Sequence, residues 1–289
     1  MNSQIVKIPV TQWQLPETDC NWIAALEQGK VLYFPTLPFS LSKKEQHLLT
    51  PAVLHAKVRN ISLSADNQLT GAVGDEHTQQ LLSAMLERYR SQAEQLIHSL
   101  LPKYQGALRS APTSYRPKKV EARKQSWRAD DRRMHVDAFP SRPNHGERIL
   151  RVFSNINPDG VPRVWRVGEP FEDMLKTMLP RTKPYVRWQA KALHKLGITK
   201  SLRSPYDHLM LQLHDSMKAD MQYQQEAQQV RMPFAPGSVW VCFSDHALHG
   251  VESGKYMLEQ TFHIAPEHQY DPSVSPLAHL SEVMQRPLV

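Results

Sequence analysis

Apolar residues recur at steps of three and four positions through the end of the first hundred residues. This repeat covers 78–101 and stops at Pro102, which predicts one long amphipathic helix. Earlier in the chain, 30–35 has the length and composition of a short strand. The segment 42–49 predicts a helix, because it opens with a serine that has a glutamate three positions on. Residues 1–110 therefore predict a mixed, mostly helical region.

The pattern changes from about Pro112 to short apolar runs separated by proline, glycine and asparagine turns. Such runs are typical of an antiparallel sandwich or barrel. The expected strands are Met134–Phe139, Arg148–Asn155, Arg163–Val167, Ser238–Phe243 and Tyr256–Ile264, with a further strand beginning over Tyr206–Leu213. Two segments, 172–179 and 185–196, have helical patterns instead.

These elements predict an α+β fold with a jelly-roll core, a cupin-like double-stranded β-helix, and helices packed on its outside. The expected organisation is an N-terminal region, 1–110, packed on a core of 111–289 that carries a helical insertion at about 170–200. The 289 residues are enough for one large domain or two small ones. We expect the two parts to form one structural unit.

Composition narrows the class of protein. Apolar residues make up 40% and charged residues 22% of the chain, which argues against a disordered or fibrous protein. No apolar run approaches the roughly 18 to 20 residues of a membrane-spanning helix. The start of the chain lacks the pattern of a secretory signal, and only Cys20 and Cys242 are present. We therefore expect a cytoplasmic protein, without a disulfide framework.

The charge is concentrated in one segment. The chain has 35 Lys and Arg against 28 Asp and Glu, a net charge of +7, and residues 109–133 alone hold nine basic and three acidic residues. A positive segment of this kind attracts anions, although it can also be a solvated loop. Few aromatic residues accompany the charges and no nucleic-acid-binding motif is present. An anionic partner other than nucleic acid is therefore expected.

A possible metal site lies in the predicted strand 134–139. Successive side chains of a strand alternate between its faces, so His135 and Asp137 point the same way. One imidazole and one carboxylate are two of the three ligands of the facial triad that holds non-haem Fe(II). A third ligand is available after the strand 238–243, where both His246 and His249 occur. We favour His249, because it precedes a turn into the last strand, and keep His246 as the alternative.

Oxygenases with this triad usually use a 2-oxo acid, whose far carboxylate requires a buried cation. Strand alternation puts Arg151 and Asn155 on one face of the strand 148–155 and Arg148 on the other. If the first face is inward, Arg151 would bind the carboxylate through two hydrogen bonds and Asn155 would add another. Arg148 is the alternative, and Arg151 could instead form a structural ion pair with a neighbour such as Glu147 or Asp159.

Several long segments resemble the Kdo hydroxylase family, the Fe(II)- and 2-oxoglutarate-dependent dioxygenases that act on 3-deoxy-D-manno-oct-2-ulosonic acid (Kdo). They are HVDAFPSRPNHGERILRVFSNINPDGVPRVWRVGEPFE, PGSVW, SGKYMLEQTFHIAPE and SPLAHL, within about Ser126 to Leu280. The resemblance implies hydroxylation at carbon 3 of a Kdo unit in the lipopolysaccharide inner core, with succinate and carbon dioxide as co-products. It implies Fe(II), 2-oxoglutarate and O2 as requirements, with ascorbate as a supporting reductant in vitro. The implied iron ligands are His135, Asp137 and His249.

The implied partner is an anionic glycolipid, a Kdo-containing lipid A precursor, at the cytoplasmic face of the inner membrane of a Gram-negative bacterium. Polar residues of the same stretch and of the basic segment are candidates for its carboxylates, hydroxyls and phosphates: Arg128, Arg142, Arg163, Trp165, Arg166, Lys118 and Lys119. Lys118, Lys119, Arg123 and Lys124 are further predicted to steer this substrate by their charge. Oligomeric state does not follow from the sequence.

Two other functions fit the same residues. One is a 2-oxoglutarate oxygenase that acts on a different anionic substrate. The other is a jelly-roll protein without catalytic activity that binds a metal for structural reasons, because a fold does not dictate a function. Loss of succinate production on replacing His135 or Asp137 would separate the enzymes from the binding protein.

Overall fold

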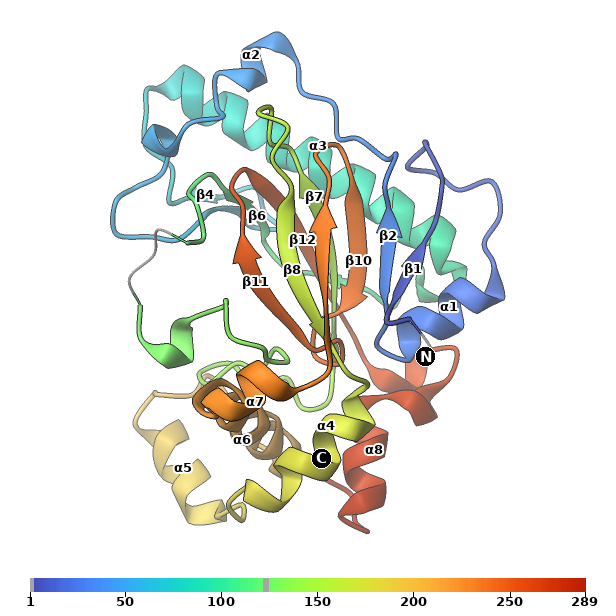
Figure 1. Cartoon of the computed structure of the whole chain (residues 1–289). Coiled ribbons are helices and arrows are strands. Elements are labelled where there is room, and N and C mark those ends of the chain that lie inside the picture. Colours follow the sequence, from blue (N-terminus) through green and yellow to red (C-terminus); the bar gives the residue numbers. More distant parts are fainter. Residues whose placement is uncertain (1–2, 122–124) are drawn as a thin grey trace.

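The computed structural model describes residues 3–121 and 125–289 and consists of two β-sheets with helices on one face and at one end (Figure 1). Among the described residues, the larger sheet has nine strands in the order β1-β2-β10-β7-β12-β6-β3-β4, with β5 paired beside β12. The smaller sheet has the order β11-β8-β9. All the pairs in both sheets are antiparallel except β1 with β2.

The strands and helices have the following bounds. The strands are β1 (Ile5–Lys7), β2 (Val31–Phe34), β3 (Ile61–Leu63), β4 (Leu69–Thr70), β5 (Arg109–Ser110), β6 (Thr113–Arg116), β7 (Arg148–Asn155), β8 (Arg163–Gly168), β9 (Gln229–Phe234), β10 (Val239–Phe243), β11 (His249–Ser253) and β12 (Met257–Ile264). The helices are α1 (Cys20–Glu27), α2 (Lys43–Gln46), α3 (Glu76–Leu100), α4 (Phe171–Met178), α5 (Arg187–Lys195), α6 (Pro205–Ala219), α7 (Met221–Glu226) and α8 (Pro276–Val283).

The central strands are apolar on both faces because both faces are covered. On β10, Val239, Val241 and Phe243 belong to the core under α1 and α3, whereas Trp240 and Cys242 face the smaller sheet. Helix α3 runs along the back of the larger sheet, and Tyr89 in its middle donates a hydrogen bond of 3.0 Å to a carbonyl of β7. This helix therefore fixes the outer face of β7 and leaves its inner face to the space between the sheets.

A separate helical layer closes one end of the sandwich. Helices α4 to α8 gather below the sheets in Figure 1. Apolar side chains of α4, α6, α7 and α8 form a core of their own with Met134, Val136 and Leu248. The end of the sheets beside His135 and His249 is therefore covered by helices.

The structure confirms the α+β fold with a jelly-roll-like core and external helices. The strand 148–155 matches β7, and the helices at 78–101 and 185–196 match α3 and α5. Ser42 caps α2 with the expected capping box. Of the described residues, no helix has both the length and the apolar character needed to cross a bilayer.

Two predicted strands were wrong. The segment from Tyr206 to Leu213 is the first half of α6, because Ser204, Pro205 and Asp207 form a capped helix start and apolar side chains then follow at helical spacing. The helical insertion accordingly extends to Glu226 rather than 200. The segment 134–139 contains only a single bridge, between His135 and His249, instead of a strand.

Candidate metal centre and the cavity around it

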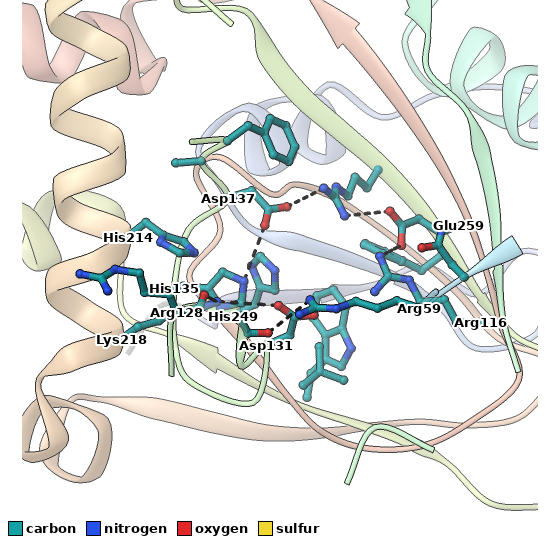
Figure 2. Close-up of a pocket in the computed structure, with 18 of the residues that line it drawn as sticks. Arg59, Arg116, Arg128, Asp131, His135, Asp137, His214, Lys218, His249 and Glu259 are labelled. Atoms are coloured by element: carbon teal, nitrogen blue, oxygen red, sulfur yellow. Dashed lines mark hydrogen bonds and ion pairs between the residues drawn. The ribbon is translucent and has the colours of Figure 1, made fainter. Parts of the chain in front are cut away.

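A cavity of about 580 Å³ opens between the two sheets beside α6 (Figure 2). Its lining contains six basic and four acidic side chains, an excess of two positive charges when the histidines are neutral. The charged residues are Arg59, Arg116, Arg128, Arg151, Arg163, Lys218, Asp131, Asp137, Asp215 and Glu259. The cavity is therefore suited to an anionic ligand.

Three predicted residues converge in this cavity: His135, Asp137 and His249. One possible ligand atom from each lies within 4.8 Å of the others, and His135 Nε2 is 3.6 Å from Asp137 Oδ1. Two backbone hydrogen bonds of 2.9 Å join His135 to His249 and hold their rings on the same side. The alternative ligand, His246, does not line the cavity.

The close pairing of these segments depends on Gly250. A Cβ atom at this position would lie 2.9 Å from the backbone oxygen of Arg132. The chain leading to His135 can therefore approach β11 only where β11 has no side chain. Behind His249, Trp165 stacks on its ring with a centroid distance of 5.0 Å and limits its rotation.

Both histidines present the ring nitrogen that a metal needs. Nδ1 of His135 lies 2.7 Å from the Arg133 carbonyl, and Nδ1 of His249 lies 2.8 Å from the Ala247 carbonyl. A carbonyl can only accept a hydrogen bond, so each Nδ1 carries the hydrogen. Each Nε2 then keeps its lone pair, the arrangement in which metal-binding histidines are usually held.

The electrostatic environment favours the same protonation states. Burial, with the charge of His249 adding to it, lowers the pKa of His135 to about 4, and burial also lowers the pKa of His249. Burial alone would raise the pKa of Asp137, but the Arg151 guanidinium and the two histidines hold it well below its usual range. Two neutral imidazoles and a carboxylate fit a facial triad for a divalent metal such as Fe(II).

A chain of buried ion pairs leads away from Asp137. Arg151 Nη2 lies 3.0 Å from Asp137 Oδ2, and Arg151 Nη1 donates to Glu259 Oε1 at 2.8 Å. The other oxygen of Glu259 lies 2.8 Å from Arg116 Nη2. Figure 2 shows this row running from Asp137 to Glu259 and Arg116. Arg151 thus orients the carboxylate of the triad while it faces the cavity.

The other predicted cosubstrate residues lie elsewhere. Arg148 is fully buried on the opposite face of β7, where its Nε donates to Asp245 at 2.7 Å. Asn155 donates to the carbonyls of Val161 and Phe234 and does not line the cavity. Arg148 and Asn155 are therefore not placed to contact a ligand in the cavity, which corrects the prediction from the sequence. Strand alternation placed Arg151 and Arg148 on opposite faces, as observed.

The predicted substrate residues divide into two groups. Arg128, Arg163 and Trp165 line the cavity. Arg142, Arg166, Lys118 and Lys119 do not line it. Arg166 instead donates to the backbone carbonyls of Arg132 and Gln224, which makes it a brace for the segment before His135. Arg123 and Lys124 lie outside the described residues.

Several arginines of the basic segment form ion pairs. Arg109 pairs with Glu147, Arg128 with Asp215, and Arg132 with Asp130. Arg116 turns inward to Glu259. Through Glu147, Asp215 and Glu259, the positive charge counted along the sequence is therefore partly neutralised by side chains that are distant in the chain.

Sequence reasoning missed several cavity residues. One of them is Glu259, which shares the inward face of β12 with Met257, another residue that lines the cavity. A charged residue on the inward face of a strand was a signal that could have been used. His214 and Lys218 lie one helical turn apart on α6, and the early part of this helix was interpreted as a strand. Arg59 lies in a loop, and no pattern in the sequence marks it.

Comparison with known proteins agrees with this geometry. A model of the family described as 3-deoxy-D-manno-oct-2-ulosonic acid (Kdo) hydroxylase matches residues 10–287. None of the curated proteins matched the chain.

Solved structures of a Kdo hydroxylase, KdoO, are similar over almost the whole chain. KdoO is described as a non-heme Fe(II) alpha-ketoglutarate dependent dioxygenase. Its complex with alpha-ketoglutarate and Fe(III) is 42% identical, with 99% of this chain and 97% of that chain covered and a TM-score of 0.94. Its complex with cobalt(II) is also 42% identical, with 99% and 98% covered and a TM-score of 0.95. The chain therefore belongs to the Kdo hydroxylase family.

Proposed function

We propose that this protein is an Fe(II)- and 2-oxoglutarate-dependent dioxygenase that hydroxylates carbon 3 of a Kdo unit. The observation that carries the proposal is the convergence of His135, Asp137 and His249 in a cavity with an excess of positive charge. Family membership and the metal and alpha-ketoglutarate complexes of KdoO support the reaction class. The choice of carbon 3 as the hydroxylated position rests on the sequence resemblance.

His135, Asp137 and His249 would hold the iron on one side and leave its remaining positions toward the cavity. When bound, Fe(II) supplies the chemistry by which O2 converts 2-oxoglutarate to succinate and carbon dioxide and hydroxylates the sugar. The protein keeps both imidazoles neutral, keeps Asp137 ionised and orients its carboxylate through Arg151. The residues around the site thus set the protonation states of the metal ligands and the orientation of the Asp137 carboxylate.

For the far carboxylate of 2-oxoglutarate we propose Arg151. Three residues were predicted for this role: Arg151, Asn155 and Arg148. Of these, only Arg151 lines the cavity. Its guanidinium already contacts two carboxylates, and a planar guanidinium can rearrange its hydrogen bonds to receive a third. Arg116 and Arg163 share the cavity wall with it and are the alternatives.

The proposed substrate is a Kdo-containing lipid A precursor, bound with its sugar acid toward Arg128 and Arg163. Both line the cavity, and Arg128 comes from the basic segment. Such a lipid would be met at the cytoplasmic face of the inner membrane of a Gram-negative bacterium. Lys118 and Lys119 have no ion pair with another described residue, and their steering of the anionic lipid remains a prediction.

Incubation with Fe(II), ascorbate, 2-oxoglutarate and a Kdo-containing lipid A precursor should add one oxygen to the lipid, detected by mass spectrometry and located at carbon 3 by NMR. Asp137→Ala should reduce product and succinate formation together by at least about a hundredfold, because an essential metal ligand is lost. His47→Ala, which changes an exposed histidine, is the matched control. Succinate formation without an oxidised lipid would indicate a different substrate. An iron-loaded enzyme that forms neither product would contradict the proposed reaction.

Replacement of Arg151 tests the cosubstrate assignment. Arg151→Lys keeps a positive charge beside Asp137 but loses the planar fork, so the apparent KM for 2-oxoglutarate should rise about tenfold or more. Arg286→Ala removes an exposed arginine and should leave this KM unchanged. If Arg151→Lys had an unchanged KM, the role would pass to Arg116 or Arg163.

Gln224 on α7 positions the segment that carries His135. Its Oε1 accepts from Met134 N at 2.6 Å, and its Nε2 donates to the carbonyls of Met134 and Met217 at 3.0 and 2.8 Å. These contacts replace the strand partners that this segment lacks. Gln224 is almost fully buried, so water cannot easily replace it.

Gln224→Ala should lower the free energy of unfolding by about 1–3 kcal/mol, because buried backbone groups lose their partners. It should also weaken Fe(II) binding by about tenfold or more, since groups that orient ligands affect affinity on this scale. Denaturant unfolding and iron titration measure the two effects. Gln222→Ala, at an exposed position of the same helix, is the control. Unchanged iron affinity would show that Gln224 supports only the fold.

A further inference from the structure

A second group of potential metal ligands lies outside the cavity, where the helical layer meets the sandwich. Glu172 is in the first turn of α4, His246 is in the loop between β10 and β11, and His279 is on α8. One possible ligand atom from each lies within 4.8 Å of the others. Three segments that are far apart in the sequence therefore bring two imidazoles and one carboxylate together.

His246 packs edge-on against Phe171 with a ring centroid distance of 5.2 Å, but one of its ring nitrogens is left for a ligand. It is 1% exposed, and its ring lies so close to Gly29 that a Cβ there would be 2.8 Å from Cγ of the ring. Its Nδ1 is 3.1 Å from the Glu27 carbonyl and 3.3 Å from an Arg148 nitrogen. We assign the hydrogen to Nδ1 because the carbonyl, which can only accept, is nearer than the Arg148 nitrogen, which can only donate.

The other ring nitrogen of His246 is left without a partner. Nε2 is buried and has no hydrogen bond to any described residue. His135 and His249 show the same arrangement, with Nδ1 bound to a backbone carbonyl and Nε2 available. A buried polar atom without a partner costs about 1–3 kcal/mol, and a metal bound at this nitrogen would remove that cost.

The remaining two residues do not satisfy this nitrogen. His279 Nε2 lies 3.0 Å from Glu172 Oε1, an ion-pair distance, but makes no hydrogen bond to a described residue. This ion pair does not account for His246, whose ring lies beside that of His279 with a centroid distance of 5.9 Å. A cation between the three groups would use all of them at once.

We propose that Glu172, His246 and His279 form a second metal site, one that binds Zn2+. Two histidines and one glutamate are a common zinc donor set that leaves a fourth position open. Glu172 and His279 also line an open groove of about 690 Å³, which gives the ion access and room for a water molecule as fourth ligand. His246 forms the closed, inner side of the site.

Such an ion would join α4 and α8 to the loop that leads into β11. Strand β11 begins with His249, only three residues after His246. The zinc would therefore stabilise the attachment of the helical layer to the strand that supplies the iron ligand. Its role is structural and does not depend on the proposed reaction.

Zinc stoichiometry of the full chain tests this site separately from the iron site. In His135→Ala/Asp137→Ala, which removes the first site, metal analysis after zinc loading should find about one equivalent bound. Adding His279→Ala should abolish this binding, and adding Glu172→Gln, a change of a partly exposed side chain, should weaken it at least tenfold. Adding His268→Ala, an exposed histidine near α8, should leave it unchanged. Cobalt(II) in the same background should give the absorption bands of a tetrahedral site.

Two results would overturn the proposal. One is a folded His135→Ala/Asp137→Ala protein that binds no zinc. The other is binding that stays at about one equivalent with unchanged affinity when both Glu172→Gln and His279→Ala are present. Circular dichroism establishes that each variant is folded. Because turnover is not measured, failure of the proposed hydroxylation would leave the outcome of this experiment unaffected.

Discussion

The buried ion pair between Asp137 and Arg151 determines how the centre of this protein is built. A carboxylate removed from water is costly unless a positive charge and hydrogen bonds compensate it. Arg151 supplies that charge from the inner face of β7, and Glu259 on β12 and Arg116 on β6 continue the alternation of charges. The interior between the sheets is therefore polar at one end, although aromatic side chains fill the other.

The charged side chains at this polar end are held in place by the packing of the surrounding elements. Helix α3 fixes the outer face of β7 through its apolar stripe and Tyr89, so the inward direction of Arg151 is set by packing on the opposite side. At the end that the helical layer covers, α7 holds the irregular segment before His135 through Gln224. The ligand cluster thus depends on two layers of helices that contact different parts of the sandwich.

The sequence predicted the parts of this arrangement that follow from local periodicity. Strand alternation placed Arg151 and Arg148 on opposite faces of one strand, and the spacing of His135 and Asp137 predicted that both would face one site. It could not predict partners brought together by topology, such as Arg116 with Glu259 or His246 with His279. The segment around His135 was interpreted as a strand, because its dependence on a side chain from α7 leaves no local pattern. His246 was considered as an alternative iron ligand, but the fold places it outside the cavity, beside Glu172 and His279.

The central claim is that His135, Asp137 and His249 hold the catalytic iron, and anomalous X-ray scattering at the iron edge tests it most directly. Crystals prepared without oxygen, with Fe(II) and 2-oxoglutarate, should show one strong peak about 2.0–2.3 Å from a ligand atom of each residue, a typical metal–ligand distance. The far carboxylate of 2-oxoglutarate should lie on the Arg151 side of that peak. An iron peak beside His246 and His279, with none between His135 and His249, would contradict the account.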